Sequence, residues 1–410
     1  MTYDLIVVGG GPAGMMAAGT AANRGKKVLL IEKNAQVGKK ILITGKGRCN
    51  LTNDCQVEDI IDNFPNTGKF LYSSLYSFSN WQLRDFFKQL GVETKVERGN
   101  RVFPVSDSAR DIVEALKNFM ESAGVEIKLN TAIQEIITED KKVVGVRSRD
   151  GEVYSANNVL VAVGGKAYPT TGSSGDGYGM AKSLGHNLIK AKPSLVPLKV
   201  KEEWFKELQG LNLKNITVSL VIDGKKKKEE FGEMLFTHFG VSGPIILTLS
   251  RDVLDYLGKH QIKLAINLKP ALSYEQLDNR LQRDFEKYSR KQFKNSLIDL
   301  LPSKIIPVIV NLLSIPEDKF VHQITTEERE EIISLLTNLE MTIIGTMGFR
   351  QAIVTSGGID TDEINPSTME SKIIDSLYFA GEVIDVDAYT GGYNLQGAFS
   401  MGYVVGNNIY

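Results

Sequence analysis

Short apolar runs and one glycine-rich turn form the pattern at the start of the chain. Residues 5–8 are apolar, which predicts a strand buried on both faces of a sheet. The turn GGGPAG follows, and the alanine-rich stretch after it, which ends at Gly25, predicts a helix. The next apolar run, KVLLIE, predicts a second strand that ends at Glu32. This order predicts a strand–turn–helix–strand unit of a parallel α/β sheet.

The glycines of the first turn have separate mechanical roles in such a unit. Gly9 permits the tight turn, Gly11 lets the backbone approach a pyrophosphate, and Gly14 lets helix and strand pack closely. The predicted helix begins at Pro12 and Ala13, and its free N–H groups and positive dipole end point at the phosphates. The turn therefore predicts a dinucleotide site.

The end of the second predicted strand narrows the choice of nucleotide. Glu32 can accept hydrogen bonds from the hydroxyl groups of the adenosine ribose. Its negative charge disfavours a 2′-phosphate, so NADP is not the expected ligand of this site. Lys33, the next residue, joins the predicted cofactor contacts. FAD and NAD both remain possible from this unit alone.

A second strand, turn and helix at the C-terminal end favour FAD. The apolar run 377–380 predicts a strand, and a helix is expected from about Asn394. An acid after the strand can meet the ribityl chain, and the helix start can face the flavin edge where charge collects on reduction. The predicted FAD contacts here are Gly381, Glu382, Gly391, Gly392, Tyr393, Asn394, Leu395 and Gln396.

The middle of the chain predicts a meander and then an insertion. Alternating residues over 125–165, with Asp150-Gly151 as a hairpin turn, predict several strands. A β-branched segment over 216–238 predicts a hairpin, and residues 273–300 have helical spacing. The predicted domains are 1–193 with 357–410, and an insert over 194–356 that is β-rich over 194–270 and 341–356 and helical over 271–340.

Composition excludes several kinds of protein. The 410 residues are 42% apolar and 24% charged with a formal net charge of −1, which is ordinary for a soluble globular chain. Cys49 and Cys55 are the only cysteines, so a disulfide framework or a four-cysteine zinc site is not expected. The four histidines lack metal-ligand spacing, and no metal is predicted.

The expected location is the cytoplasm. The N-terminal residues lack the basic region and apolar core of a signal peptide. The longest apolar stretch, residues 305–315, is about half the length that a membrane span needs. No membrane association is therefore predicted.

Charge is uneven within the predicted insert. Between Lys259 and Lys304 there are ten basic and five acidic residues. A solvated surface and an RNA contact are both open readings of this segment. For the lysine run 225–228, next to two glutamates, a solvated surface is the preferred interpretation.

Several longer motifs carry a family resemblance. KILITGKGRCNLTN, AVGGKAYPTTGSSGDGYGMA, LFTHFGVSGP and TGGYNLQGAFSMG occur in this order. Together they resemble the BaiN/RdsA family of NAD(P)/FAD-dependent oxidoreductases, often labelled aminoacetone oxidase, over Tyr3 to Ile409. The resemblance implies an α/β fold: a Rossmann-like FAD-binding domain, an inserted β-rich, barrel-like substrate domain and a small helical subdomain. Ala132 and Ile133 resemble the backbone contact for adenine, and Gly164 returns the chain to the cofactor.

The GKGRCN loop is expected at the cofactor. Gly45 and Gly47 allow backbone amides to approach the FAD pyrophosphate and the flavin edge. Arg48 can offset phosphate charge, and Asn50 can hydrogen-bond the cofactor. For Cys49 a small buried residue beside the flavin is preferred to a reactive thiol, and both interpretations remain open.

The substrate side of the site has three candidate catalytic residues. Tyr168 and Tyr393 could donate a proton or orient a carbonyl, and His238 could act as an acid or base. An aromatic wall and a turn cap are equally open structural roles for these side chains. No second strand–turn–helix fingerprint occurs between residues 40 and 380, so NAD(P)H is expected only as a transient electron donor at the flavin.

The resemblance implies reduction of an activated C=C bond, in a small molecule such as a steroid enone or in uridine of 23S rRNA. The RNA uridine is the leading substrate because of the basic insert. One alternative is an oxidase of a small amine such as aminoacetone that produces hydrogen peroxide. Another is a flavin-carrying RNA-binding factor without turnover. The oligomeric state is left open.

Overall fold

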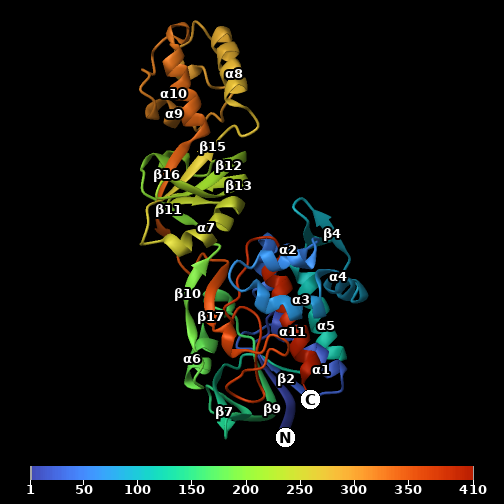
Figure 1. Cartoon of the computed structure of the whole chain (residues 1–410). Coiled ribbons are helices and arrows are strands. Elements are labelled where there is room, and N and C mark those ends of the chain that lie inside the picture. Colours follow the sequence, from blue (N-terminus) through green and yellow to red (C-terminus); the bar gives the residue numbers. More distant parts are fainter. Residues whose placement is uncertain (1, 410) are drawn as a thin grey trace. The chain divides into compact units, whose positions relative to one another are not determined.

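The computed structural model describes residues 2–409, which form two compact units (Figure 1). The first unit contains the chain up to Ser194 and from Gly348 onward, and the second contains Leu195–Met347. The chain returns to the first unit earlier than the predicted residue 357. The reason is that Val354–Ile359 (β17) pairs antiparallel with Leu188–Ser194 (β10). The insertion therefore begins after β10 and ends before β17, the two strands that pair with each other.

The first unit is built on a mixed seven-stranded sheet of order β6-β2-β1-β9-β8-β7, with β18 also paired to β9. β1 pairs in parallel with β2 and β9, and β18 and β6 continue the parallel part. β7, β8 and β9 form the antiparallel meander. The strands are Thr2–Val8 (β1), Val28–Ile31 (β2), Glu126–Lys128 (β6), Ile133–Glu139 (β7), Lys142–Ser148 (β8), Val153–Val161 (β9) and Leu377–Phe379 (β18).

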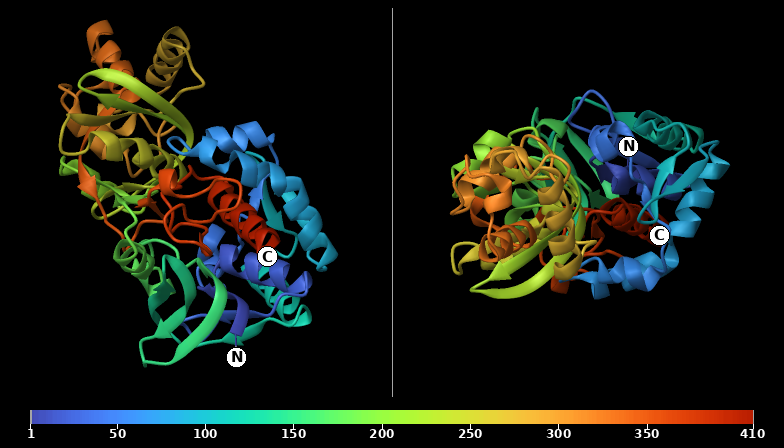
Figure 2. Two further views of the ribbon diagram at one scale, coloured as in Figure 1. Left: turned by 60° about the horizontal axis from the view of Figure 1, so that its bottom comes forward. Right: turned by 90° about the horizontal axis from the view of Figure 1, so that it is seen from above.

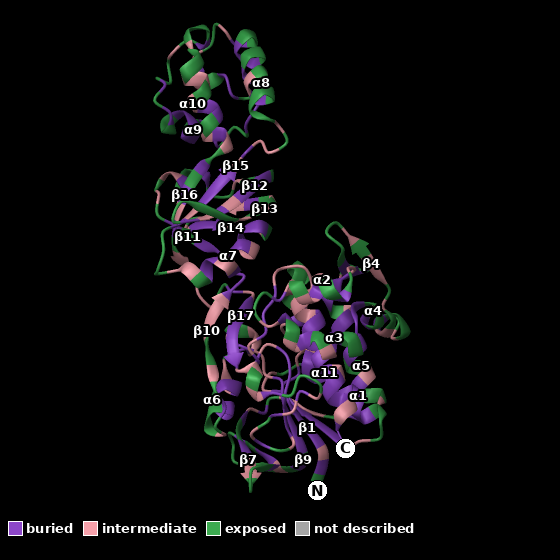
Figure 3. Ribbon diagram, in the orientation of Figure 1, coloured by how far each residue is buried: buried purple, intermediate pink, exposed green. Residues whose placement is uncertain are grey.

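Two long helices of the first unit lie side by side (Figure 2). Pro12–Asn23 (α1) is buried over most of its length, and Tyr393–Asn408 (α11) packs against it (Figure 3). Small residues make this approach possible: a Cβ at Gly406 would lie 2.8 Å from the Ala17 carbonyl oxygen. The first predicted helix and the last one therefore share one apolar core with the parallel strands.

Shorter elements complete the first unit. Their helices are Val57–Asp62 (α2), Tyr72–Ser77 (α3), Asn80–Gln89 (α4), Ala109–Ser122 (α5) and Asp176–Ser183 (α6). A small sheet has the order β3-β5-β4, with bounds Thr52–Asn53 (β3), Thr94–Glu97 (β4) and Arg101–Pro104 (β5). The 3₁₀ helices of the first unit are Ile41–Gly47 (η1), Gly68–Leu71 (η2), Pro169–Thr171 (η3) and Thr361–Glu363 (η7).

The second unit contains a closed barrel of order β11-β14-β13-β12-β15-β16, in which neighbouring strands are antiparallel. The predicted hairpin is present, with Asp223-Gly224 between its strands. Apolar side chains of the strands fill the interior, among them Val218 and Leu264. The strands are Leu198–Val200 (β11), Asn212–Ile222 (β12), Lys225–Phe236 (β13), Gly240–Ser242 (β14), Ile262–Asn267 (β15) and Leu339–Thr346 (β16).

Helices are inserted between β15 and β16, as the sequence predicts. The second unit has the helices Pro244–Tyr256 (α7), Tyr274–Lys287 (α8), Ile306–Leu312 (α9) and Thr326–Thr337 (α10), and the 3₁₀ helices Trp204–Leu208 (η4), Phe293–Asn295 (η5) and Val321–Gln323 (η6). Capping boxes of Ser273 with Gln276 and of Thr325 with Glu328 start α8 and α10. The predicted fold class, a Rossmann-like α/β domain with an inserted barrel and a small helical part, is confirmed.

Candidate functional site

The turn between β1 and α1 has the geometry of a phosphate cradle. Gly9 has φ +109°, and a Cβ there would lie 2.6 Å from the Ala162 carbonyl oxygen. A Cβ at Gly14 would overlap the carbonyl oxygen of Gly9. A Cβ at Gly11 meets only the Ala162 oxygen, at 3.9 Å, so the protein itself leaves this position open. The first and third glycines thus serve the fold, while Gly11 leaves room for a ligand.

Glu32 is a fixed, buried carboxylate at the end of β2. The residue is 8% exposed. Its Oε2 accepts from the Gly10 backbone N–H at 2.7 Å, and its Oε1 accepts from the Asn34 N–H at 2.8 Å and the Asn34 side-chain amide at 2.6 Å. These donors orient the carboxylate beside the turn. The ribose contact expected of Glu32 stays a prediction.

The glycine-rich segment 171–176 is tied to the end of β2. The Lys33 ammonium group donates to the Asp176 carboxylate at 2.6 Å and to the Ser174 hydroxyl. The Asn34 side chain donates to the Thr171 carbonyl at 3.2 Å. Burial alone would raise the pKa of Asp176, but the hydrogen bond and charge of Lys33 lower it overall. Lys33 therefore has protein partners, and the sequence did not predict that this segment lies beside the end of β2.

The loop GKGRCN has an unusual backbone. Gly45, Lys46 and Cys49 have φ of +57°, +60° and +59°. Cys49 is completely buried, and burial raises the pKa of its thiol to about 12. Both observations favour the small buried residue over the reactive thiol.

Arg48 is held by groups of the protein. Its guanidinium donates to the carboxylates of Glu97 and Asp107, with 2.8 Å between Nε and an Asp107 oxygen. The group lies 4.2 Å from the centre of the Phe103 ring. Two carboxylates therefore already offset its charge, and the expected contact of Arg48 with phosphate stays a prediction.

Two motifs far apart in the sequence meet at β3 and the start of α11. The Asn50 amide, oriented so that its nitrogen donates to the Thr52 carbonyl at 3.1 Å, accepts from the Gly392 N–H at 3.0 Å. Asn53 donates to the Gly391 carbonyl at 3.1 Å. Gly392 has φ +99°, and a Cβ there would lie 2.5 Å from the Thr52 carbonyl carbon. The GKGRCNLTN and TGGYNLQ blocks thus hold each other in place.

Amide side chains of the TGGYNLQ block bond within the protein. Asn394 accepts from the Ala388 N–H at 2.9 Å and donates back to the Ala388 carbonyl at 3.0 Å. Gln396 is completely buried; it accepts from the Thr52 hydroxyl at 2.7 Å and donates to the Phe78 carbonyl at 3.1 Å. The start of α11 has no side-chain cap. Backbone N–H groups, rather than these amides, are what α11 offers to a ligand.

Glu382, after β18, links three segments of the first unit. Its carboxylate pairs with the Lys40 ammonium group at 2.5 Å and accepts from the Thr355 N–H at 2.8 Å. The Thr355 hydroxyl accepts from the Lys166 N–H at 2.8 Å, next to the predicted contact Gly164. Lys40 and Thr355 were not among the predicted residues, because only the fold brings them to Glu382.

A buried hydroxyl lies unsatisfied in the same region. Tyr178, on α6, is 7% exposed, and its hydroxyl has no hydrogen-bond partner among residues 2–409. Burial, and then the charges of Glu382 and Asp385, raise the pKa of Tyr178. Native proteins rarely leave such a group unpaired. Tyr178 was not among the predicted residues, since a tyrosine in a glycine-rich stretch carries no specific signal.

The three predicted catalytic residues belong to different parts of the chain. Tyr168 is half-buried in the left-handed region, with φ +53°, and its N–H donates to the Phe349 carbonyl at 3.2 Å. Burial raises the pKa of Tyr393 to about 12. His238 is exposed in the second unit, between β13 and β14, with its ring edge-on to Phe239. Their convergence on one substrate stays a prediction.

The adenine contact also stays a prediction. Ala132 accepts from the Arg149 N–H at 2.8 Å, Ile133 begins β7, and the neighbouring Thr131 N–H donates to the Glu32 carbonyl at 3.1 Å. These bonds bring the Ala132–Ile133 segment beside the end of β2, which is the side expected for adenosine.

Comparison with known proteins decides the family. The model described as the HI0933-like protein Rossmann domain matches residues 3–408. The chain belongs to this family. The resemblance expected from the motifs is thereby confirmed, and the enzyme is an FAD-type oxidoreductase of the HI0933-like family.

Named relatives cover the whole chain. The 3-dehydro-bile acid delta(4,6)-reductase of Clostridium scindens is 34% identical over 405 residues, which are 98% of this chain and 97% of that protein. A ribosomal RNA dihydrouridine synthase of Escherichia coli is 32% identical over 410 residues, covering 99% of this chain and 98% of its own length. An open-conformation flavocytochrome c3 fumarate reductase has a TM-score of 0.54 at 17% identity, covering 100% of this chain and 78% of its own. This last similarity shows a shared fold.

Two kinds of feature are not found among the described residues. Among the described residues, no helix has the length and apolarity needed to cross a membrane. No group of three or more histidine, cysteine, aspartate or glutamate side chains in residues 2–409 is arranged to hold a metal ion.

Proposed function

We propose that this member of the HI0933-like family binds FAD in its first unit and reduces an activated C=C bond, with a uridine of ribosomal RNA as the leading substrate. The observation that carries the proposal is the end-to-end similarity to two relatives whose names describe such reductions. A bile acid delta(4,6)-reductase saturates a conjugated ring, and a dihydrouridine synthase saturates the C5=C6 bond of uridine. A cytoplasmic location follows from this choice of substrate.

The residues of the first unit fit FAD. The open position at Gly11 and the N-terminus of α1 would receive the pyrophosphate, and the buried Glu32 would accept from the ribose. The uncapped start of α11 would face the flavin, and the unpaired hydroxyl of Tyr178 would gain a partner. When bound, the flavin supplies two-electron transfer between a donor and an electron-poor carbon.

Other residues of the chain would hold this site in place. Lys40 and the Thr355 N–H fix the Glu382 carboxylate, so that its position does not depend on the ligand. Asn50 and Gln396 fix the start of α11 against β3. Such preorganisation lowers the entropy lost on binding.

A tyrosine is the proposed proton donor. Saturation of a C=C bond needs a proton at the carbon next to the one that receives the electron pair. With its pKa raised to about 12, Tyr393 keeps its hydroxyl proton at neutral pH. Tyr168, half-buried in a strained backbone conformation, is the second candidate for the same task.

NAD(P)H is the proposed electron donor. Within residues 2–409, β1, the glycine-rich turn, α1 and β2 form the strand–turn–helix–strand unit that would bind a dinucleotide. In this proposal FAD occupies that unit. The donor would therefore reach the flavin at the face that later receives the substrate. Alternating use of one face predicts ping-pong kinetics.

Mass mapping of ribosomal RNA tests the proposal. A strain without the gene should lose a dihydrouridine in 23S rRNA, and the purified protein with NAD(P)H should restore it. Anaerobic NAD(P)H should bleach the yellow protein. Unchanged dihydrouridine content with bleaching intact would refute the RNA substrate alone. Peroxide formation from aminoacetone, without bleaching by NAD(P)H, would favour the amine oxidase over the reductase. If neither reaction occurs, the RNA-binding factor without turnover is the function that is left.

A further inference from the structure

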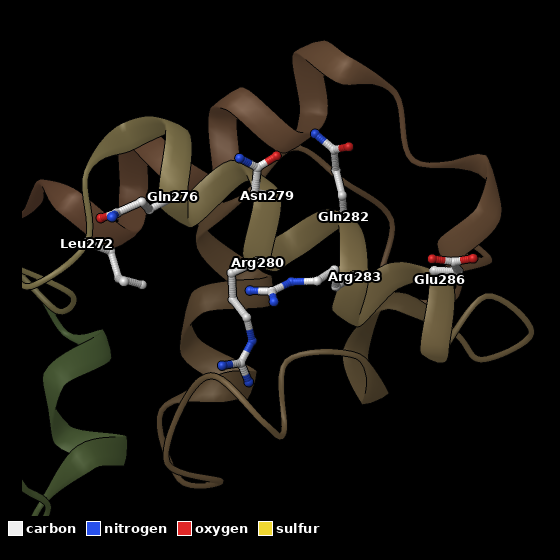
Figure 4. A pocket seen from close by; sticks show the side chains of 7 residues that line it. All are labelled: Leu272, Gln276, Asn279, Arg280, Gln282, Arg283 and Glu286. Carbon is white, nitrogen blue, oxygen red and sulfur yellow. The ribbon is translucent and has the colours of Figure 1, made fainter.

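Helix α8 presents a polar, basic face to solvent. Leu277, Leu281 and Phe285 of this helix are buried in the core of the second unit. The opposite face borders an open depression of about 810 Å³. It is lined by Leu272, Gln276, Asn279, Arg280, Gln282, Arg283 and Glu286 (Figure 4). Figure 4 shows Arg280 and Arg283 beside one another on this helix.

Ion pairs remove part of the charge that the sequence count suggests. Arg280 donates from Nε to both carboxylate oxygens of Asp284, at 3.0 and 2.9 Å. Lys287 pairs with Asp299 at 2.6 Å, and Asp278 pairs with Arg329. These pairs also hold Arg280 and Lys287 in fixed positions. The ratio of ten basic to five acidic residues therefore overstates the free charge.

Three exposed cations remain without an ion pair on α8 and the turn that follows it. Arg283, Arg290 and Lys291 have no carboxylate partner among the described residues, and Lys291 lies 4.5 Å from the centre of the Tyr288 ring. Arg283 lies on the exposed side of α8, and Arg290 and Lys291 follow the end of the helix at Lys287. Two exposed acids, Glu275 and Glu286, oppose them in part. These three cations and two acids together keep one net positive charge.

Lys269, near Arg280, also lies in positively charged surroundings. Lys269 is half-buried, and burial, followed by the charge of Arg280, lowers its pKa. Lys269 has no carboxylate partner in the described chain. An anion at this face would relieve the repulsion between the two cations.

We propose that the exposed face of α8 and the turn after it bind the phosphodiester backbone of an RNA substrate. The face from Gln276 to Lys287 is roughly 16 Å long at 1.5 Å per residue, enough for several successive phosphates, and its depression is open rather than enclosed. Amides of Gln276, Asn279 and Gln282 can donate to and accept from ribose hydroxyls. An extended polyanion suits this shape better than a small anion does. This inference rests on the proposed function, because it takes RNA as the substrate.

Neutralisation of the three cations that have no ion pair tests the docking surface. The variant R283Q/R290Q/K291Q is compared with K214Q/K225Q/K227Q, which removes the same charge from exposed lysines of the barrel. Affinity of the flavin-loaded, full-length protein for 23S rRNA from the deletion strain is measured by filter binding over a range of salt. Circular dichroism and the visible flavin spectrum check that each variant folds.

The α8 variant should lose affinity and salt dependence together. Each phosphate contact contributes about 0.7 to 0.9 to the slope of log K against log salt, which is about five- to eightfold in affinity at 0.1 M salt. Three lost contacts predict a slope lower by about 2 to 3 and binding weaker on the order of 100-fold. The barrel variant should keep the wild-type slope.

Each other outcome overturns the docking surface in a distinguishable way. Wild-type binding by the α8 variant places RNA elsewhere while leaving RNA as substrate. Equal losses in both variants show an effect of overall charge. Absence of rRNA binding by the wild-type protein, with unchanged dihydrouridine in the deletion strain, refutes the proposed function as well. Equal competition by polyglutamate identifies a surface for any polyanion, an acidic protein included.

Discussion

Replacement of Gly11 by alanine separates what the fold requires of the glycine-rich turn from what a ligand requires. A Cβ at Gly11 meets only the Ala162 carbonyl oxygen, at 3.9 Å, an ordinary van der Waals distance. The backbone of Gly11 is extended, with φ −85° and ψ −175°, a conformation that alanine adopts readily. Alanine restricts the unfolded chain, which stabilises the protein by about 0.4 to 1 kcal/mol. Its weakness as an N-cap residue opposes this by a similar amount. The free energy of unfolding of the apoprotein should therefore change by less than about 1 kcal/mol.

Affinity for FAD should change much more. In the proposed site the backbone at Gly11 approaches the pyrophosphate, and a methyl group would occupy that space. We expect the Kd for FAD to rise at least tenfold, which is about 1.4 kcal/mol. The stabilisation that excess FAD gives falls by the same amount. For a unit of this size the Tm of the flavin-loaded protein drops by roughly 3 to 6 °C.

Fluorescence titration of the apoprotein with FAD, and thermal melts with and without FAD, measure both effects. Gly345→Ala is the matched control, because a Cβ there meets only Lys199 Cδ, at 3.8 Å, in the second unit. Unchanged affinity in G11A would refute the placement of the pyrophosphate at this turn. A large loss of apoprotein stability would refute the steric reasoning.

Three further changes test other parts of the site. Gln396→Leu leaves the Thr52 hydroxyl without its acceptor, whereas the Phe78 carbonyl still accepts from the Ser400 hydroxyl, so the apoprotein should lose about 1 to 3 kcal/mol; unaltered chemical unfolding would contradict the role of the amide. In Cys55→Ala, the remaining Cys49 thiol should resist Ellman's reagent at pH 8 until the chain is unfolded, because burial raises its pKa to about 12; rapid labelling of the native protein would instead support the hypothesis that Cys49 is a reactive thiol. Tyr393 has a folded-state pKa of about 12, above its usual value of 10, so its contribution to stability is complete below pH 10 and is lost as the pH rises towards 12; a difference titration of phenolate absorbance against Tyr393→Phe should place it there, and titration near pH 10 would contradict the burial.

The parts of the fold that follow from local physics were predictable. The apolar run 5–8, the glycines after it and the acid at residue 32 predict one supersecondary unit within about thirty residues, and β1, α1 and β2 form it. The hairpin around Asp223-Gly224 is equally local. Closure of the barrel by β11 and β16 was not predictable in detail, because the partners Leu198 and Thr346 are far apart along the chain.

In the candidate site, too, the features set by local backbone geometry were predictable and those set by long-range contacts were not. Roles of Gly9 and Gly14 follow from backbone geometry, and the structure has both contacts. Asn394 and Gln396 were expected to contact the cofactor through a motif, yet their side chains bond to Ala388, Thr52 and Phe78. Sequence proximity to a glycine-rich turn cannot distinguish a residue that touches a ligand from one that holds the turn. Tyr178 and Lys40 were missed because their surroundings come from segments that only the fold brings together.

In the helical part of the second unit, ion pairing rather than amino-acid composition determines how much surface charge is available to a ligand. Asp284, Asp299 and Asp278 each face a cation, so these acids and their partners contribute little field at a distance. The unpaired Arg283, Arg290 and Lys291 remain to attract a polyanion. Three exposed cations, opposed in part by Glu275 and Glu286, on a chain of net charge −1 would give local binding that is steep in salt. Weak salt dependence of rRNA binding by the wild-type protein would therefore contradict this view of the surface even where the affinity itself is high.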